Sequence, residues 1–94
     1  MVSIWKYKII PLAEVQTFDM PEGADILSVG IDPQGDICFW ALVDTEAREV
    51  ERRLWCVGTG WPLDEMGIES ATYIGMVIRH PYVWHILAEE EVYE

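Results

Sequence analysis

Residues 25–43 read DILSVGI-DPQGD-ICFWALV, and this stretch decides the fold class of the chain. Two runs rich in β-branched and aromatic residues flank the polar segment Asp32–Asp36, where Pro33 and Gly35 are typical of a turn. This spacing predicts a β-hairpin that turns within the polar segment. The second run is apolar at every position, so we expect its strand to be central and covered on both faces.

Further short strands are expected on either side of this hairpin. The expected strands cover residues 3–10, 14–18, 25–31, 37–43, a segment that ends at 57, 71–79 and 82–88. This regular spacing predicts a mainly β chain, folded as a small antiparallel barrel or sandwich of six to seven short strands. A chain of 94 residues fits a single domain, which we place at 1–88, followed by an acidic C-terminal tail at 89–94.

The segment 44–57 fits two patterns. A short helix around 45–54 is favoured by apolar residues at helical spacing. A strand is favoured by the alternation that follows residue 49 and by the apolar run 54–57, which is a poor helix end. We expect a polar turn at 44–48 followed by a strand, and the short helix is the alternative.

The chain is strongly acidic, because 17 Asp and Glu against 6 Lys and Arg give a net charge of −11. Such a field repels nucleic-acid backbones and anionic membranes, so we expect neither duplex nucleic acid nor a membrane as a partner. A solvated acidic surface is the simplest interpretation, and a nucleic-acid mimic directed at a basic groove is the alternative. No apolar run reaches the roughly 18–20 residues of a transmembrane helix, and the first residues lack a signal-peptide pattern.

Residues suited to catalysis or metal binding are sparse. His80 and His85 lack further histidines or cysteines at metal-ligand spacing. No serine stands in a nucleophile-elbow motif, and neither Cys38 nor Cys56 has an electropositive neighbourhood. Both cysteines lie in apolar strand-like runs, which favours buried reduced thiols, with a disulfide between strands as the alternative. We therefore expect a protein without enzyme activity, metal or cofactor.

Aromatic residues are more abundant than one small core can bury: five Trp, four Tyr and two Phe. Some of these rings are therefore expected to line a ligand site or a subunit interface. The turn Gly58-Thr59-Gly60 suits either an anion-cradling nest or a tight turn that needs positive φ. The candidate ligand-binding residues are Arg52, Arg53, Trp55, Gly58, Thr59, Gly60, Trp61, Arg79, Trp84 and His85.

Six ordered motifs along nearly the whole chain resemble a family of small uncharacterised proteins of tailed phages and prophages. These motifs are Trp5-Lys6-Tyr7, residues 20–29 (MPEGADILSV), residues 40–44 (WALVD), Gly58-Thr59-Gly60 with Pro62, Tyr73-Ile74-Gly75 and Val83-Trp84-His85. The chain departs from the family pattern at Trp61, where the family has His, and in the acidic extension after Leu87. The resemblance implies an accessory phage protein located in the host bacterial cytoplasm, where such proteins often act on host immunity.

Three functions follow from these observations. The first is a homo-oligomeric binder that sequesters a small anionic signal of the cyclic-nucleotide type, in a pocket closed between subunits. The second is an acidic inhibitor that blocks a basic host protein. The third is a small nucleotide-cleaving enzyme that uses His85 and a carboxylate as an acid–base pair. We favour the first, which is motivated by the aromatic surplus, the Gly58-Thr59-Gly60 turn and the set Arg52, Arg53 and Arg79. The enzyme is ranked last, because the sequence shows no recognisable nucleophile or metal constellation.

Overall fold

The hairpin expected from residues 25–43 is present in the computed structural model, which describes residues 1–90. Strands β3 (Asp25–Ile31) and β4 (Ile37–Asp44) pair antiparallel across the turn. The Asp32 carboxylate organises this turn, because its Oδ1 accepts the backbone N–H groups of Gln34 and Asp36 at 3.0 and 2.9 Å. Its Oδ2 accepts a hydrogen bond from Lys6 Nζ at 2.8 Å, and this bond, with the Asp36 N–H, lowers the pKa of Asp32 to about 2.

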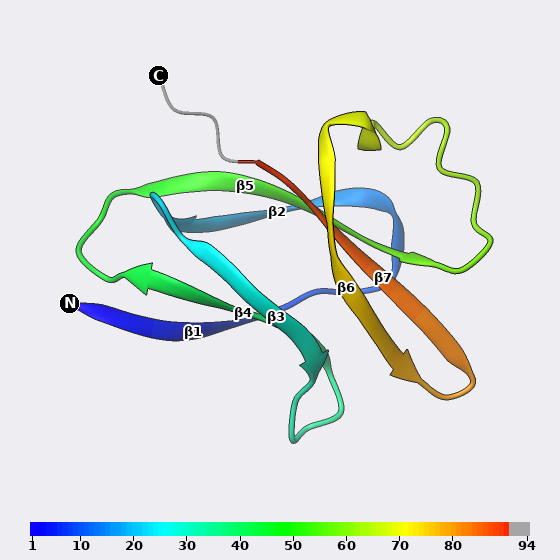
Figure 1. Ribbon diagram of the computed structural model, residues 1–94, viewed down its shortest axis with the longest axis horizontal. Coiled ribbons are helices and arrows are strands. Elements are labelled where there is room, and N and C mark those ends of the chain that lie inside the picture. The colour runs from blue at the N-terminus through cyan, green and yellow to red at the C-terminus, as the bar shows by residue number, and fades with distance from the viewer. Residues whose placement is uncertain (91–94) are drawn as a thin grey trace.

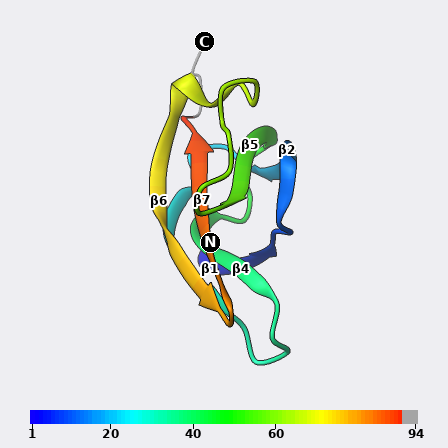
Figure 2. The same ribbon diagram turned by 90° about the vertical axis from the view of Figure 1, so that its right-hand side faces the viewer.

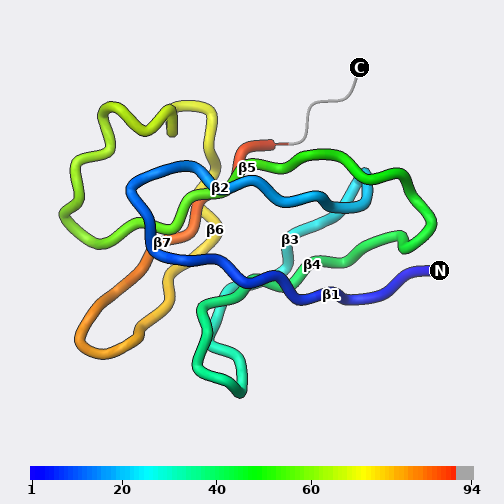
Figure 3. The backbone as a smooth tube through the Cα atoms, turned by 180° about the vertical axis from the view of Figure 1, so that it is seen from behind, coloured from blue at the N-terminus to red at the C-terminus, as the bar shows by residue number. Residues whose placement is uncertain are grey.

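The seven strands of residues 1–90 form two antiparallel sheets, a three-stranded sheet of order β1-β4-β3 and a four-stranded sheet of order β2-β5-β7-β6 (Figure 1). The remaining elements are β1 (Val2–Lys8), β2 (Leu12–Pro21), β5 (Glu49–Gly58), β6 (Ala71–Arg79), β7 (Tyr82–Glu89) and the short 3-10 helix η1 (Ile68–Ser70). Figure 3 shows how β1 runs into β2 and so connects the two sheets at the end away from the N-terminus.

The core lies between the facing sides of the two sheets. Phe39 of β4 is fully buried, stacks on Tyr7 at 5.0 Å and meets the edge of Phe18 at 5.1 Å between ring centroids. The cluster is completed by buried aliphatic residues from both sheets, chiefly Ile9, Met20, Ile37, Val43, Leu54, Val77 and Ile86. The alternation along these strands therefore gives each sheet one side that faces the other sheet.

Segment 44–57 contains the expected turn and strand, so the alternative helix at 45–54 is wrong. Strand β5 pairs with β2 on one side and with β7 on the other. A helix in this place would leave β2 without a ladder partner and β7 with β6 alone, and this tertiary requirement outweighs the helical spacing of the apolar residues. The barrel alternative is also wrong, because the two sheets are not closed into a barrel: no ladder joins β3 to β6 within residues 1–90.

Strand boundaries and covering differ from expectation in several places, among them β1, which ends at Lys8 and not at Ile10. Strand β2 is longer than the expected 14–18 at both ends: pairing with β5 continues in register to Pro21, and a register shift between Leu12 and Gln16 lets it include Leu12. Strand β4 is central but is not covered along its whole outer face, since Leu42 is 40% exposed. Strand β7 includes Glu89, the first residue of the expected tail, and residues 91–94 lie outside the described part.

Segment 59–70 covers part of the outer side of the four-stranded sheet. Trp55 projects to this side yet is completely buried, and its indole Nε1–H donates to the Met66 carbonyl at 2.9 Å. Cys38 and Cys56 are both buried and unpaired, so the expected free thiols are confirmed and the disulfide alternative is wrong. Burial raises the pKa of Cys56 to about 11, which makes this thiol a poor nucleophile. No helix within residues 1–90 has the length and apolar character needed to cross a membrane.

Candidate functional site

A pocket of about 410 Å³ lies at the end of the four-stranded sheet where β5 ends and the β6–β7 hairpin turns. Figure 1 shows this hairpin projecting at the lower right, beyond the strands of the smaller sheet. The lining residues are Gly58, Thr59, Trp61, Pro81, Tyr82, Val83 and Trp84. Three of the seven are aromatic, and no lining residue carries a formal charge.

The aromatic rings of the pocket are arranged around Trp84. Trp61 meets Trp84 at 5.5 Å between ring centroids with an interplanar angle of 81°. Tyr82 lies 5.7 Å from Trp84 and is tilted by 42°. Tyr82 and Trp84 are two residues apart on β7, so strand alternation sends both rings to the same side of the sheet. The arrangement offers ring faces and edges to a flat ligand.

Gly58 is required for the position of Trp61. A Cβ atom at Gly58 would lie 2.6 Å from the Trp61 Nε1 atom, which is shorter than any ordinary contact. The chain then reverses so that the Trp61 N–H donates to the Gly58 carbonyl at 3.1 Å, with Gly60 at φ +86°. Glycine supplies the close approach at one position and the left-handed backbone at the other.

The Gly58–Gly60 turn does not offer its backbone amides freely to an anion. The Thr59 N–H donates to the Val83 carbonyl at 3.3 Å, and the Trp61 N–H is used in the turn itself. The structure therefore assigns these glycines to the geometry of a tight turn, and gives the nest interpretation no support at these two amides.

His85 lies beside the pocket and is held at both ring nitrogens. Its Nε2 is 2.6 Å from Thr59 Oγ1, and its Nδ1 is 2.8 Å from the Tyr73 hydroxyl. Hydroxyl groups both donate and accept, so this pair satisfies either neutral tautomer of the ring. Thr59 thus connects the pocket wall to His85.

The two arginines of β5 lie away from the pocket. Arg52 is 8% exposed and donates from Nη1 to the Ala24 carbonyl at 3.0 Å. Arg53 forms an ion pair with Glu89 at 3.0 Å and lies over the Trp55 ring, 5.6 Å from its centroid. Gly58 is six residues from Arg52, or about 20 Å along a strand. The candidate residues Arg52, Arg53 and Trp55 therefore serve another part of the molecule.

Arg79 is the arginine that the sheet register brings nearest to the pocket. It pairs with Tyr82 across the β6–β7 hairpin, and directly opposed residues of an antiparallel pair project to the same side. The sequence-predicted residues that the structure brings together are Gly58, Thr59, Gly60, Trp61, Trp84, His85 and, at the margin, Arg79.

Sequence reasoning missed four residues of this region: Tyr73, Pro81, Tyr82 and Val83. A signal for Tyr82 was available, because its alternation with Trp84 on one strand predicts a shared side. Tyr73 carried no such signal, since its contact with His85 depends on the β6–β7 register and on the shift between Tyr73 and Gly75. No group of three or more His, Cys, Asp or Glu side chains suited to a metal ion is present in residues 1–90.

Fold and site together define the class of protein: a small two-sheet β domain with an uncharged aromatic pocket at one end of its larger sheet. The chain belongs to the family described as Domain of unknown function (DUF7352), which matches residues 1–94. No curated protein and no solved structure matches the chain.

Proposed function

We propose that this protein is a non-enzymatic binding protein whose aromatic pocket takes a small nucleotide-type ligand through its base. The observation that carries the proposal is the grouping of Trp61, Tyr82 and Trp84 around one cavity of about 410 Å³. This volume falls within the range of about 300–1,000 Å³ typical of small-molecule sites. Stacking on aromatic side chains contributes about 1–3 kcal/mol for each base and needs no particular sequence.

Charge near the pocket supports a ligand with one anionic end. Arg79, opposite Tyr82 on the hairpin, is the proposed contact of a phosphate group. The remaining surface is acidic, with a net charge of −11, and acts against binding of extended polyanions. A small nucleotide avoids most of this repulsion because its charge is confined to the neighbourhood of the hairpin.

The hydrogen bonds of His85 support a binding role over a catalytic one. Both ring nitrogens have hydroxyl partners, Thr59 and Tyr73, and neither partner is a carboxylate that would make the imidazole a stronger base. The setting proposed for this activity is that of a bacteriophage protein in the host cytoplasm, where it sequesters a defence signal. What supports that setting is the resemblance of six ordered sequence motifs to small proteins of tailed phages.

The proposal is tested by native mass spectrometry and calorimetry of the protein with a panel of cyclic and linear nucleotides. We expect one class of nucleotide to bind and to be recovered unchanged. The variant Trp61→Ala should weaken that binding by about 10-fold or more, because one stacking surface is lost. The matched control is Trp5→Ala, a tryptophan on β1 that is 38% exposed and outside the pocket, and it should leave the affinity unchanged.

Other outcomes of this experiment separate the remaining hypotheses. Conversion of a nucleotide to product would overturn the proposal in favour of a nucleotide-cleaving enzyme. If no nucleotide binds, and the protein instead forms a salt-sensitive complex with a basic host nuclease, the acidic-inhibitor hypothesis replaces it. Equal loss of affinity in the Trp5 and Trp61 variants would place the ligand elsewhere.

A further inference from the structure

We infer that β6 is a dimerisation strand, which pairs antiparallel with β6 of a second copy of this chain. The two four-stranded sheets would then continue into one eight-stranded sheet related by a two-fold axis. This inference goes beyond the proposed function and does not depend on the identity of the ligand.

The first observation is that β6 is the free edge of its sheet. Its ladder partner within residues 1–90 is β7, on one side only. Figure 2 shows β6 at the margin of the molecule. Strand β3 of the other sheet packs against the inner side of β6, where a Cβ atom at Gly75 would lie 3.0 Å from Val29 Cγ2, but forms no ladder with it. The β6 backbone donors and acceptors that point away from β7 are therefore available to another strand.

The second observation is that β6 carries no charge before its last residue, Arg79. Proteins commonly place charged residues on edge strands to prevent pairing with another molecule. Strand β1 carries Lys6 and Lys8 and β2 carries Glu14 and Asp19, whereas β3 carries a single charge, Asp25, at its beginning. Residues 71–78 of β6 carry no charge.

The third observation is that β6 is apolar on the sheet face that points away from the core. Tyr73, Met76 and Ile78 are 52%, 55% and 54% exposed. The register places them opposite Leu87, His85 and Val83 respectively, so all three project to the side away from the core. Pairing of two β6 strands brings the two apolar rows next to each other across the two-fold axis and removes part of both from water.

Charge identifies a second copy as the partner. Two chains of net charge −11 repel each other wherever carboxylates meet, and the neutral row 71–78 allows close approach. The residues that flank this row have opposite signs, with Glu69 before it and Arg79 at its end. Antiparallel pairing therefore sets unlike charges near each other at both ends. An antiparallel edge is also self-complementary, as a two-fold interface requires.

The test is the mass of the full chain in solution without nucleotide, measured by sedimentation equilibrium over a range of concentrations. We expect wild-type protein to form a dimer of twice 10.8 kDa. The double variant Met76→Lys/Ile78→Lys should be monomeric. The control Ile4→Lys/Leu42→Lys introduces the same charges on the exposed outer side of the smaller sheet and should remain dimeric.

A second measurement keeps the inference testable if the β6 variant fails to fold. Hydrogen exchange of wild-type protein should show greater protection of amides in residues 71–79 at concentrations that favour the dimer. A wild-type monomer at all concentrations would overturn the inference, as would a dimer that survives in the folded β6 variant. Nucleotide binding, measured separately on the monomeric variant, reports on the proposed function alone.

Discussion

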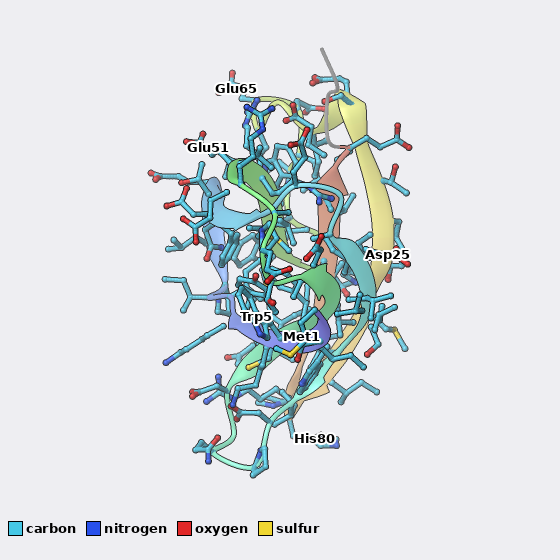
Figure 4. The ribbon with its side chains drawn as sticks, turned by 90° about the vertical axis from the view of Figure 1, so that its left-hand side faces the viewer. Met1, Trp5, Asp25, Glu51, Glu65 and His80 are labelled. Atoms are coloured by element: carbon cyan, nitrogen blue, oxygen red, sulfur yellow. The ribbon has the colours of Figure 1, made fainter. Side chains whose placement is uncertain are left out.

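The two ends of β5 differ in what their residues contact. At its beginning, Arg52 and Arg53 have partners within the chain: the Ala24 carbonyl for one, and Glu89 with the Trp55 ring for the other. At its end, Gly58 opens space for Trp61, and the rings there line a cavity. In Figure 4, Glu51 near the beginning of β5 lies in the upper part of the view and His80 of the β6–β7 hairpin lies at the bottom.

This difference distinguishes residues that hold the fold from residues that are open to a ligand. An arginine that donates a hydrogen bond to a buried carbonyl stabilises the native state, so its replacement lowers the free energy of unfolding. Aromatic rings that line a cavity can contact a bound ligand, so their replacement lowers the affinity for that ligand. Substitutions at the two ends should therefore change different measured quantities.

The largest expected effect is on stability, at Arg52. Replacement by Met removes the donor to the Ala24 carbonyl inside the molecule and leaves that acceptor without it. We expect the free energy of unfolding to fall by about 1–3 kcal/mol. Urea denaturation followed by tryptophan fluorescence measures this change. Nucleotide affinity at a temperature where the variant is folded should match wild type, and a selective loss of affinity would move the site to the arginine end.

A smaller effect, on affinity, is expected at Gly58. In Gly58→Ala the new methyl group would overlap the Trp61 indole, so the ring must move out of the pocket wall. We expect nucleotide affinity to fall by about 3–10-fold, less than complete loss of one stacked ring. Calorimetry gives the affinity, and near-ultraviolet circular dichroism reports the change at Trp61. Gly30→Ala is the control, because its Cβ would meet Trp40 at 3.4 Å, an almost ordinary contact, and neither residue lines the pocket.

The smallest effect is expected at Arg53. Its side chain is 43% exposed in the ion pair with Glu89, so solvent weakens that interaction. Together with the contact over Trp55, the loss in Arg53→Ala should cost about 0.5–1 kcal/mol of unfolding free energy. The destabilisation should shrink in high salt, and nucleotide affinity should not change. A drop in affinity as large as that of Trp61→Ala would contradict the division between the two ends of β5.

Most strand positions were predictable because turn residues and two-residue alternation are local properties. The polar turn at 32–36 and the proline after His80 mark hairpins whatever the rest of the chain does. Segment 44–57 was ambiguous because its apolar residues satisfy both periods, and the pairing of β5 on both sides decides between them. The choice between barrel and sandwich depended likewise on whether β3 and β6 share a ladder, which no local pattern encodes.

The sequence by itself determined a small acidic β chain with a glycine turn after β5 and more aromatic rings than one core can hold. Tertiary structure alone decided which rings meet. It buried Trp55 under segment 59–70, brought Trp61 onto Trp84, and set Tyr73 against His85 through the register of β6 and β7. It also gave Arg52 and Arg53 partners far from the pocket. The physical reason is that composition and alternation act between neighbours in the chain, whereas a pocket is made by residues that only the pairing of strands brings together.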